Sequence, residues 1–364
     1  MKQKISVLPL LLFMTALTTV AAAALGSALT LPVSILMSVM ALVHFISSRR
    51  EAPVQQSSGL EGYGEYELLG EGSMGRVYRA RHLALSRLVA LKKIKTENIG
   101  DIEIHRFQRE AKVLSQLENT HTIQIFDYGT TAEGEFFFAM ELLHGLDLQL
   151  WVDRFGPLNL ARTKRIMMHA TAALAEAHRL GIVHRDLKPA NLMLCHYGGE
   201  VDFLKILDFG LVKLAPVGTS LNGITRESVV LGTPAYLAPE SLFGSHSVNA
   251  AVDVYALGAI AHFLLSGTLL FNETRPMVMA QAHLQETPPS LADKGVEIPP
   301  ALEKLILQCL AKDAQERPTC EELLAGWEAI PVVEEWQKQE AETWWRNNLP
   351  EAFPKSSESS PLSA

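Results

Sequence analysis

The pattern of apolar and charged positions divides the chain near residue 50. From Ile5 to Ser48 no side chain carries a formal charge, whereas a single membrane-spanning helix needs only about 20 apolar residues. A Gly-Ser pair and a proline interrupt the middle of this run, which favours a break there. We therefore predict two transmembrane helices, at about 6–25 and 31–47, that form a membrane anchor over residues 1–50.

Basic residues flank both ends of this anchor, with two lysines before it and Arg49 and Arg50 after it. Because positive charge favours the cytoplasmic side, both ends are expected to face the cytosol. An alternative stays open, since the basic start, the apolar centre and the small residues 21–24 also match a cleaved signal peptide. In that case cleavage would remove the first span and leave 31–47 as a membrane span, and the rest of the chain would still be in the cytosol.

Beyond a polar linker at 51–62, polar and apolar residues begin to alternate along the chain. Residues 66–81 carry Gly70, Gly72 and Gly75 between two alternating stretches, which predicts two strands joined by a glycine loop. Bare glycine backbone lets an anionic phosphate approach closely. Dinucleotide-binding folds share the spacing but need a helix at the third glycine. A plain β-turn is the other alternative.

Two ionisable side chains follow at positions from which they could meet. Residues 89–94 predict a short strand with Ala90 and Lys92 on one face. Residues 104–117 predict an amphipathic helix with Glu110 on its apolar face. A buried carboxylate needs a partner, so we predict a Lys92–Glu110 ion pair. The alternatives are a solvated lysine and a glutamate at the edge of the apolar stripe.

Composition narrows the class of protein. With 48% hydrophobic and 20% charged residues, the bulk of the chain is globular. The formal net charge of -8 argues against a general nucleic-acid binder, which needs Lys and Arg to neutralise phosphates. Cys195, Cys309 and Cys320 form no CxxC pair, so neither a disulfide framework nor a zinc site is expected. The folded part suits a reducing compartment.

The strongest motifs lie in the middle of the chain. The run His184–Asn191 reads HRDLKPAN, Asp208 opens an Asp-Phe-Gly triplet, and residues 238–240 read Ala-Pro-Glu. With the glycine loop, the strand lysine and the helix glutamate, these motifs appear in the order found in protein kinases. The segment from about 66 to 330 resembles the eukaryotic-like serine/threonine protein kinases, of the membrane-anchored type found in bacteria.

The resemblance implies an α+β, bilobal protein-kinase fold, with a small β-rich N-lobe and a large α-helical C-lobe, preceded here by the transmembrane hairpin. The corresponding domains are the anchor at 1–50, the linker at 51–62, the kinase domain at 63–330, and a C-terminal helix and disordered tail at 331–364.

The resemblance also implies a role for each catalytic residue. Asp186 would accept the proton of the substrate hydroxyl and orient it, and Lys188 would place positive charge near the γ-phosphate. Asn191 and Asp208 would hold Mg2+, a cation that prefers oxygen ligands. Lys92, held by Glu110, would fix the α- and β-phosphates.

The adenine site is expected along the apolar strand at 136–143. By resemblance Met140 is the gatekeeper, the backbones of Glu141 and Leu143 bind adenine, and Asp147 contacts ribose. Apolar side chains would enclose the ring, although each could equally be ordinary core: Leu69, Val77 and Ala90 above it and Met193 below it.

Several hydroxyl side chains follow in the activation segment. We expect autophosphorylation among Thr219, Ser220, Thr225 and Ser228, with Arg185 as a cation that a phosphate could recruit. Thr233 fits the substrate groove better. The alternative is that these hydroxyls are turn formers.

Two further contacts follow from the resemblance. Asp253, at the start of an apolar helix to Leu265, would brace the catalytic loop, and Arg317 would pair with Glu240. The alternatives are a helix cap and a surface arginine. Residues 195–203 look like a hairpin extension.

The C-terminal segment carries three tryptophans, Trp336, Trp344 and Trp345, near Phe353. This cluster could dock on the kinase domain, on a partner or on the bilayer surface, or it could be a simple packed end-helix.

The expected function is transfer of the γ-phosphate of ATP to Ser/Thr hydroxyls of protein substrates, with Mg2+ and with autophosphorylation. The alternative is a catalytically silent, nucleotide-binding pseudokinase scaffold. The expected location is the inner membrane, with the kinase domain in the cytosol. Partners would be the bilayer, protein substrates and a second copy for trans-autophosphorylation, but not nucleic acid.

Overall fold

The computed structural model describes residues 60, 62–72, 75–94, 112–131, 134–209, 234–243, 249–331 and 336–353. The predicted transmembrane hairpin and nearly all of the linker lie outside these residues. Within the described ranges, none of the helices has the length and apolar character needed to cross a bilayer.

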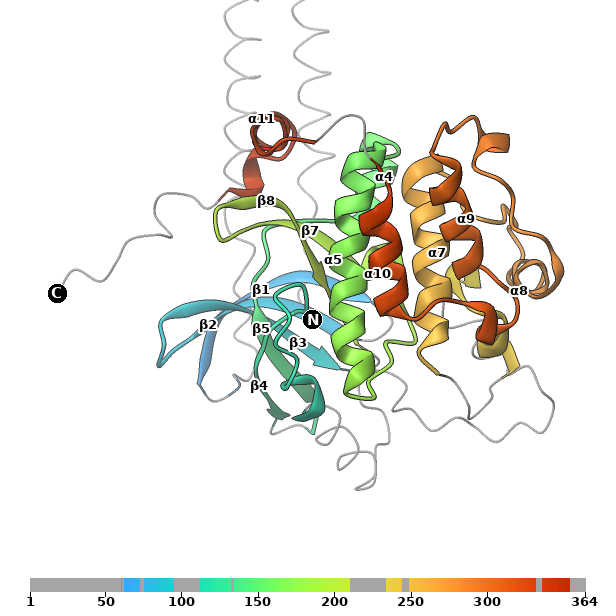
Figure 1. Ribbon diagram of the computed structural model, residues 1–364. Coiled ribbons are helices and arrows are strands. Elements are labelled where there is room, and N and C mark those ends of the chain that lie inside the picture. Colours follow the sequence, from blue (N-terminus) through green and yellow to red (C-terminus); the bar gives the residue numbers. More distant parts are fainter. Residues whose placement is uncertain are drawn as a thin grey trace, which may run out of the picture. The chain divides into compact units, whose positions relative to one another are not determined.

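The N-terminal part is a five-stranded antiparallel sheet with the strand order β1-β2-β3-β5-β4 (Figure 1). Its first three strands follow one another as a meander, as the alternation and the glycine loop predicted. The strands are β1 (Tyr63–Gly72), β2 (Gly75–His82), β3 (Arg87–Ile94), β4 (Ile125–Thr130) and β5 (Phe136–Glu141).

The two faces of this sheet belong to different hydrophobic clusters. On one face, Val89 and Leu91 pack with Phe137 in a small cluster. On the other face, Phe136 and Phe138 join the large core that continues through the helical part. Because side chains alternate along a strand, Ala90 and Lys92 lie on the face toward the helical part, as the sequence predicted.

The helical part is built around α5 and α7, with α9 and α10 packed against them (Figure 1). Helix α7 is buried along almost its whole length, which explains why its sequence lacks a polar stripe. The helices are α4 (Leu148–Phe155), α5 (Leu160–Arg179), α7 (Ala251–Ser266), α8 (Pro276–Gln285), α9 (Pro300–Cys309), α10 (Cys320–Ala329) and α11 (Lys338–Asn348).

Short 3-10 helices connect these elements: η1 (Pro189–Asn191), η2 (Pro234–Tyr236), η3 (Pro239–Phe243), η4 (Ala292–Lys294), η5 (Ala314–Glu316) and η6 (Pro350–Ala352). Of the helix predicted at 104–117, only 112–117 is described, and 112–114 are helical.

A second, three-stranded antiparallel sheet lies at the start of the helical part. It consists of β6 (Gly145–Asp147), β7 (Leu192–Tyr197) and β8 (Glu200–Ile206), in that order. Gly198 and Gly199 form the turn between β7 and β8 with positive φ, which glycine adopts without strain. The hairpin predicted at 195–203 is therefore confirmed, and α11 packs against its second strand.

Candidate active site

The loop from His184 to Asn191 is held by one buried carboxylate from α7. Asp253 accepts hydrogen bonds from the backbone N–H groups of His184, at 2.8 Å, and of Arg185, at 2.9 Å. Its Oδ2 also lies 2.8 Å from Nε2 of His178 on α5. Arg185 has a left-handed backbone, with φ 65°, a costly conformation that the surrounding contacts must hold. The predicted bracing role of Asp253 is confirmed.

Three polar side chains of this loop converge. The ammonium nitrogen of Lys188 lies 2.8 Å from Oδ2 of Asp186. Nδ2 of Asn191 donates to the backbone carbonyl of Asp186 at 2.7 Å. Because the nitrogen end of the Asn191 amide is fixed on Asp186, its oxygen end is the one that could serve as a metal ligand.

Lys92 and Asp208 bring the two sheets together at this loop. Nζ of Lys92, on β3, lies 2.5 Å from Oδ1 of Asp208, which follows β8. Lys92 is only 7% exposed. The N–H of Leu207 donates to the carbonyl of Asn191 at 2.8 Å, so Asp208 is fixed next to the Asp186–Asn191 loop.

The donor set fits a magnesium-bound triphosphate. Carboxylate and amide oxygens are ligands that Mg2+ accepts, and this cation usually binds through one or two carboxylates together with substrate phosphates. Asp208 and Asn191 supply such oxygens, while Lys92 and Lys188 supply ammonium groups that can bind phosphate. The site can therefore hold charge of both signs within a small volume.

The predicted adenine residues lie along β5 and the segment that follows it. Met140 is paired with Ala90 of β3 and lines a cavity that also contains Lys92 and Asp208. The N–H of Glu141 donates to the carbonyl of Gln124 at 3.1 Å, so a contribution of Glu141 to adenine binding would come from its carbonyl. Leu143 is half-buried in the segment between β5 and β6.

Asp147 and Met193 are opposite each other in the second sheet, where β6 pairs with β7. Asp147 also caps α4, accepting from the N–H of Leu150 at 2.9 Å. Burial raises the pKa of this carboxyl, partly offset by its backbone hydrogen bonds. Its position at a helix N-terminus and beside Met193 suits a polar contact at the edge of a bound nucleoside.

The glycine loop joins β1 to β2, and Gly72 is paired with Gly75. A Cβ on Gly75 would lie 2.0 Å from the backbone oxygen of Lys93, whereas one on Gly70 or Gly72 would meet nothing within 4 Å. Val77 is paired with Lys92, and Leu69 is 51% exposed. The hairpin thus borders the strand that carries Lys92.

Comparison with known families decides the assignment. The protein kinase domain family matches residues 63–327. The chain belongs to the protein kinase family.

Curated relatives of this kinase domain include the serine/threonine-protein kinase pkn3 of Myxococcus xanthus, 40% identical over 258 residues. The serine/threonine-protein kinase PrkC of Bacillus subtilis is 34% identical over 258 residues. Each alignment covers 70% of this chain, but only 47% and 38% of these relatives, so the chain spans less than half of their length.

A solved structure shows the same fold. The crystal structure of the PknI kinase domain of Mycobacterium tuberculosis matches with a TM-score of 0.56 and 27% identity, over 74% of this chain and 96% of that one. The predicted α+β kinase fold, with a β-rich N-lobe and a helical C-lobe, is therefore confirmed, while the transmembrane hairpin stays a prediction.

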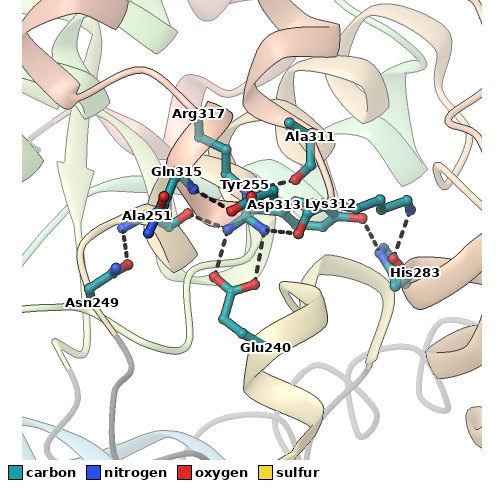
Figure 2. Close-up of polar contacts among 10 residues, drawn as sticks. All are labelled: Glu240, Asn249, Ala251, Tyr255, His283, Ala311, Lys312, Asp313, Gln315 and Arg317. Carbon is teal, nitrogen blue, oxygen red and sulfur yellow. Dashed lines mark hydrogen bonds and ion pairs between the residues drawn. The ribbon is translucent and has the colours of Figure 1, made fainter.

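The end of the activation segment is fixed by Arg317 (Figure 2). Its guanidinium donates to Oε1 and Oε2 of Glu240 at 2.6 and 2.9 Å. It also donates to the carbonyls of Ala311 at 2.8 Å, Ala251 at 2.9 Å and Lys312 at 3.2 Å. The predicted Arg317–Glu240 pair is confirmed, and it ties η3 to the helices of the C-lobe.

Two parts of the predicted site lie outside the described residues. Glu110, the expected partner of Lys92, is one of them. The other is the activation segment between 210 and 233, with its hydroxyl residues Thr219, Ser220, Thr225, Ser228 and Thr233.

The sequence analysis did not predict one buried ion pair beside the hinge, which is the segment between β5 and β6. Nζ of Lys205, on β8, lies 2.6 Å from Oε1 of Glu141, and the same oxygen accepts from the N–H of Gln124 at 2.8 Å. Both charged side chains are buried. A lysine within the apolar strand Glu200–Ile206 was the available signal, because a buried ammonium requires a partner.

Proposed function

We propose that this chain is an ATP-dependent protein kinase that transfers the γ-phosphate to Ser/Thr hydroxyls of protein substrates. One observation carries the proposal: Lys92 and Asp208, in contact at 2.5 Å, lie beside a loop that presents Asp186 and Asn191. The printed names of the relatives as serine/threonine-protein kinases support the same activity.

In this mechanism the chain mainly positions its reactants, because phosphoryl transfer passes through a loose transition state. The carboxylate of Asp186 accepts a hydrogen bond from the substrate hydroxyl, orients its oxygen and takes its proton. The ammonium group of Lys92 binds the α- and β-phosphates, and that of Lys188 binds the γ-phosphate. Asp208 and Asn191 would hold Mg2+, which would supply positive charge to neutralise the phosphates when bound.

The pseudokinase alternative is less well supported. A scaffold that binds nucleotide without chemistry has no need for the carboxylate of Asp186, yet the chain carries it, with the ammonium of Lys188 2.8 Å away.

The test is phosphate transfer by the purified full-length protein from ATP labelled at the γ position. We expect the wild type to label itself and an added protein substrate, and Asp186→Asn to label neither, because the amide cannot take the hydroxyl proton. Circular dichroism would establish that both proteins are folded. Equal incorporation by the two proteins would reject the activity.

We further propose that residues 1–50 anchor the kinase domain at the inner membrane as a two-helix hairpin, with a second copy phosphorylating the activation segment. The uncharged run from Ile5 to Ser48 supports the anchor. Protease access to tags at both termini tests the topology. An N-terminal tag cleaved only from outside would overturn the hairpin, and loss of residues 1–24 would support the signal-peptide alternative.

Phosphorylation within the activation segment is part of this proposal. Mass spectrometry after incubation with MgATP should find phosphate on one or more of Thr219, Ser220, Thr225 and Ser228. Absence of phosphate there would contradict the regulatory role.

A further inference from the structure

The C-terminal segment 336–353 lies beyond the residues that match the kinase family, which end at 327. It nevertheless contributes to the main core. Trp345 is 0% exposed, and Ala341, Leu349 and Ala352 are buried with it. Helix α11 packs on β8 rather than extending away from the domain. Of the alternatives open in the sequence, docking on the kinase domain is the one observed.

A buried carboxylate anchors this segment. Asp202, on β8, is 0% exposed and accepts hydrogen bonds from the indole Nε1 of Trp336 and that of Trp345, each at 2.6 Å. Its remaining partner among the described residues is the guanidinium of Arg162, which donates from Nε at 2.9 Å and also from Nη2. An unpaired buried carboxylate is costly, so removal of the segment would leave Asp202 with Arg162 alone.

The first connection from this segment to the nucleotide site runs through α4. The ring of Trp151, on α4, stacks on Trp344 with centroids 4.6 Å apart and lies 5.5 Å from Trp345. The N-cap of the same helix is Asp147, the proposed ribose contact. Because α4 has only eight residues, a shift of Trp151 would move its N-terminus as well.

The second connection reaches the hinge. The ring of Phe353 lies 4.9 Å from that of His196 on β7. The backbone N–H of His196 donates to the carbonyl of His144 at 3.0 Å, and His144 belongs to the segment between β5 and β6. Helix α4 and strand β7, which flank the proposed adenosine site, are therefore both in contact with the C-terminal segment.

We propose that residues 336–353 are a positioning element for the adenosine half of the nucleotide site, with Trp336 and Trp345 as positioning residues acting through Asp202. The inference rests on the proposed function, because it concerns the same nucleotide. Without the two indole donors, the helix that Asp147 caps and the strand that carries His196 lose the packing that fixes them, and nucleotide affinity falls.

The experiment compares two identical substitutions in the full-length protein. Trp336→Phe keeps a ring near Arg162 but removes the N–H bound to Asp202. Trp327→Phe is the matched control, because Trp327 is buried in α10 and its Nε1 has no hydrogen-bond partner among the described residues. Affinity for a non-hydrolysable ATP analogue with Mg2+ is measured by calorimetry, and KM for ATP and kcat by phosphate transfer.

We expect Trp336→Phe to weaken analogue binding about three- to tenfold and to raise KM for ATP by a similar factor, with kcat unchanged, as for mutations along a coupling network. Trp327→Phe should lower the melting temperature but leave the affinity unchanged. Unchanged affinity in Trp336→Phe, or equal losses in both variants, would overturn the proposal.

The two proposals can fail separately. A wild-type chain that binds the analogue but transfers no phosphate contradicts the kinase activity alone, since the affinity comparison still decides the positioning role. A wild-type chain that binds no nucleotide overturns both.

Discussion

The ammonium nitrogen of Lys92 lies 2.5 Å from Oδ1 of Asp208. The lysine comes from β3 of the N-lobe, and the aspartate follows β8 of the second sheet. The contact therefore joins the two parts of the kinase domain at the place where the phosphates of ATP are proposed to bind. A substitution that removes the charge of Lys92 is the most direct test of this site.

Lys92→Met should lower kcat/KM for phosphate transfer by about 10²- to 10³-fold, the usual effect of losing one electrostatic contact to the transition state. Methionine keeps the length of the side chain and removes its charge. Lys93→Met is the matched control, because the ammonium of Lys93 lies 3.9 Å from Glu135 rather than at Asp208. Similar rates for the two variants in a steady-state assay would contradict the assignment.

A side chain at Gly75 should destabilise the kinase domain. In Gly75→Ala the new Cβ would meet the oxygen of Lys93, and φ is 151°. We expect the free energy of unfolding to fall by about 1–3 kcal/mol, a typical cost for a strained backbone. Gly72→Ala, at a position with open space, should lose less. Urea denaturation measures both, and an equal loss would show that the close approach at Gly75 is unimportant.

Arg317→Met should destabilise the kinase domain by about 1.5–3 kcal/mol, because it removes the charge-assisted hydrogen bonds from the guanidinium to Glu240. The guanidinium is fully buried, whereas the side chain of Glu240 is 24% exposed. The double variant Arg317→Met/Glu240→Gln should lose less stability than the sum of the two single losses, since the second substitution removes an interaction that the first has already removed. A double-mutant cycle from chemical denaturation tests this, and simple additivity of the two single variants would argue against a coupled pair.

Stability should fall on mild acidification. Burial lowers the pKa of His169 to about 3, and that of His262 and of His283 to about 4. These imidazoles stay neutral in the folded chain but take up protons when unfolded, below a pKa of about 6.5. The unfolded state then binds more protons, so the free energy of unfolding decreases as pH falls from about 6.5 toward 4.

Urea denaturation across this pH range is the measurement. Each imidazole can contribute at most about 1.4 kcal/mol per pH unit. His283→Gln should flatten the dependence even if it costs stability at neutral pH, where the ring accepts or donates a hydrogen bond with the hydroxyl of Tyr255 at 2.8 Å. A slope that the substitution leaves unchanged would exclude His283 as a contributor.

Local patterns predicted much of the fold. The alternation of side chains along a strand placed Ala90 and Lys92 on one face of β3, and the apolar run that ends at Leu265 predicted a helix, which the structure shows as α7. Motif order singled out Asp186 and Asn191 on one loop and Asp208 on another segment, and the structure brings the two segments together. These features depend on residues close in sequence or on a strongly constrained chemistry.

Contacts between distant side chains were harder to foresee. Nothing near Asp202 in the sequence indicates that Arg162, Trp336 and Trp345 share its carboxylate, because no spacing rule links a strand to two helices. The tryptophans of the C-terminal segment indicate that another surface must bury them, but the sequence does not show which surface that is. For the Lys205–Glu141 pair, a lysine in an apolar strand signals that a partner exists but not which residue supplies it.

The attachment of the catalytic loop to Asp253 ties its shape to the centre of the C-lobe. This carboxylate lies in the first turn of α7, the most deeply buried helix described, and local openings of a protein seldom include its core. Heat should therefore not loosen the loop while the helix persists. Loss of catalysis on warming and the cooperative melting of the C-lobe would then be a single event.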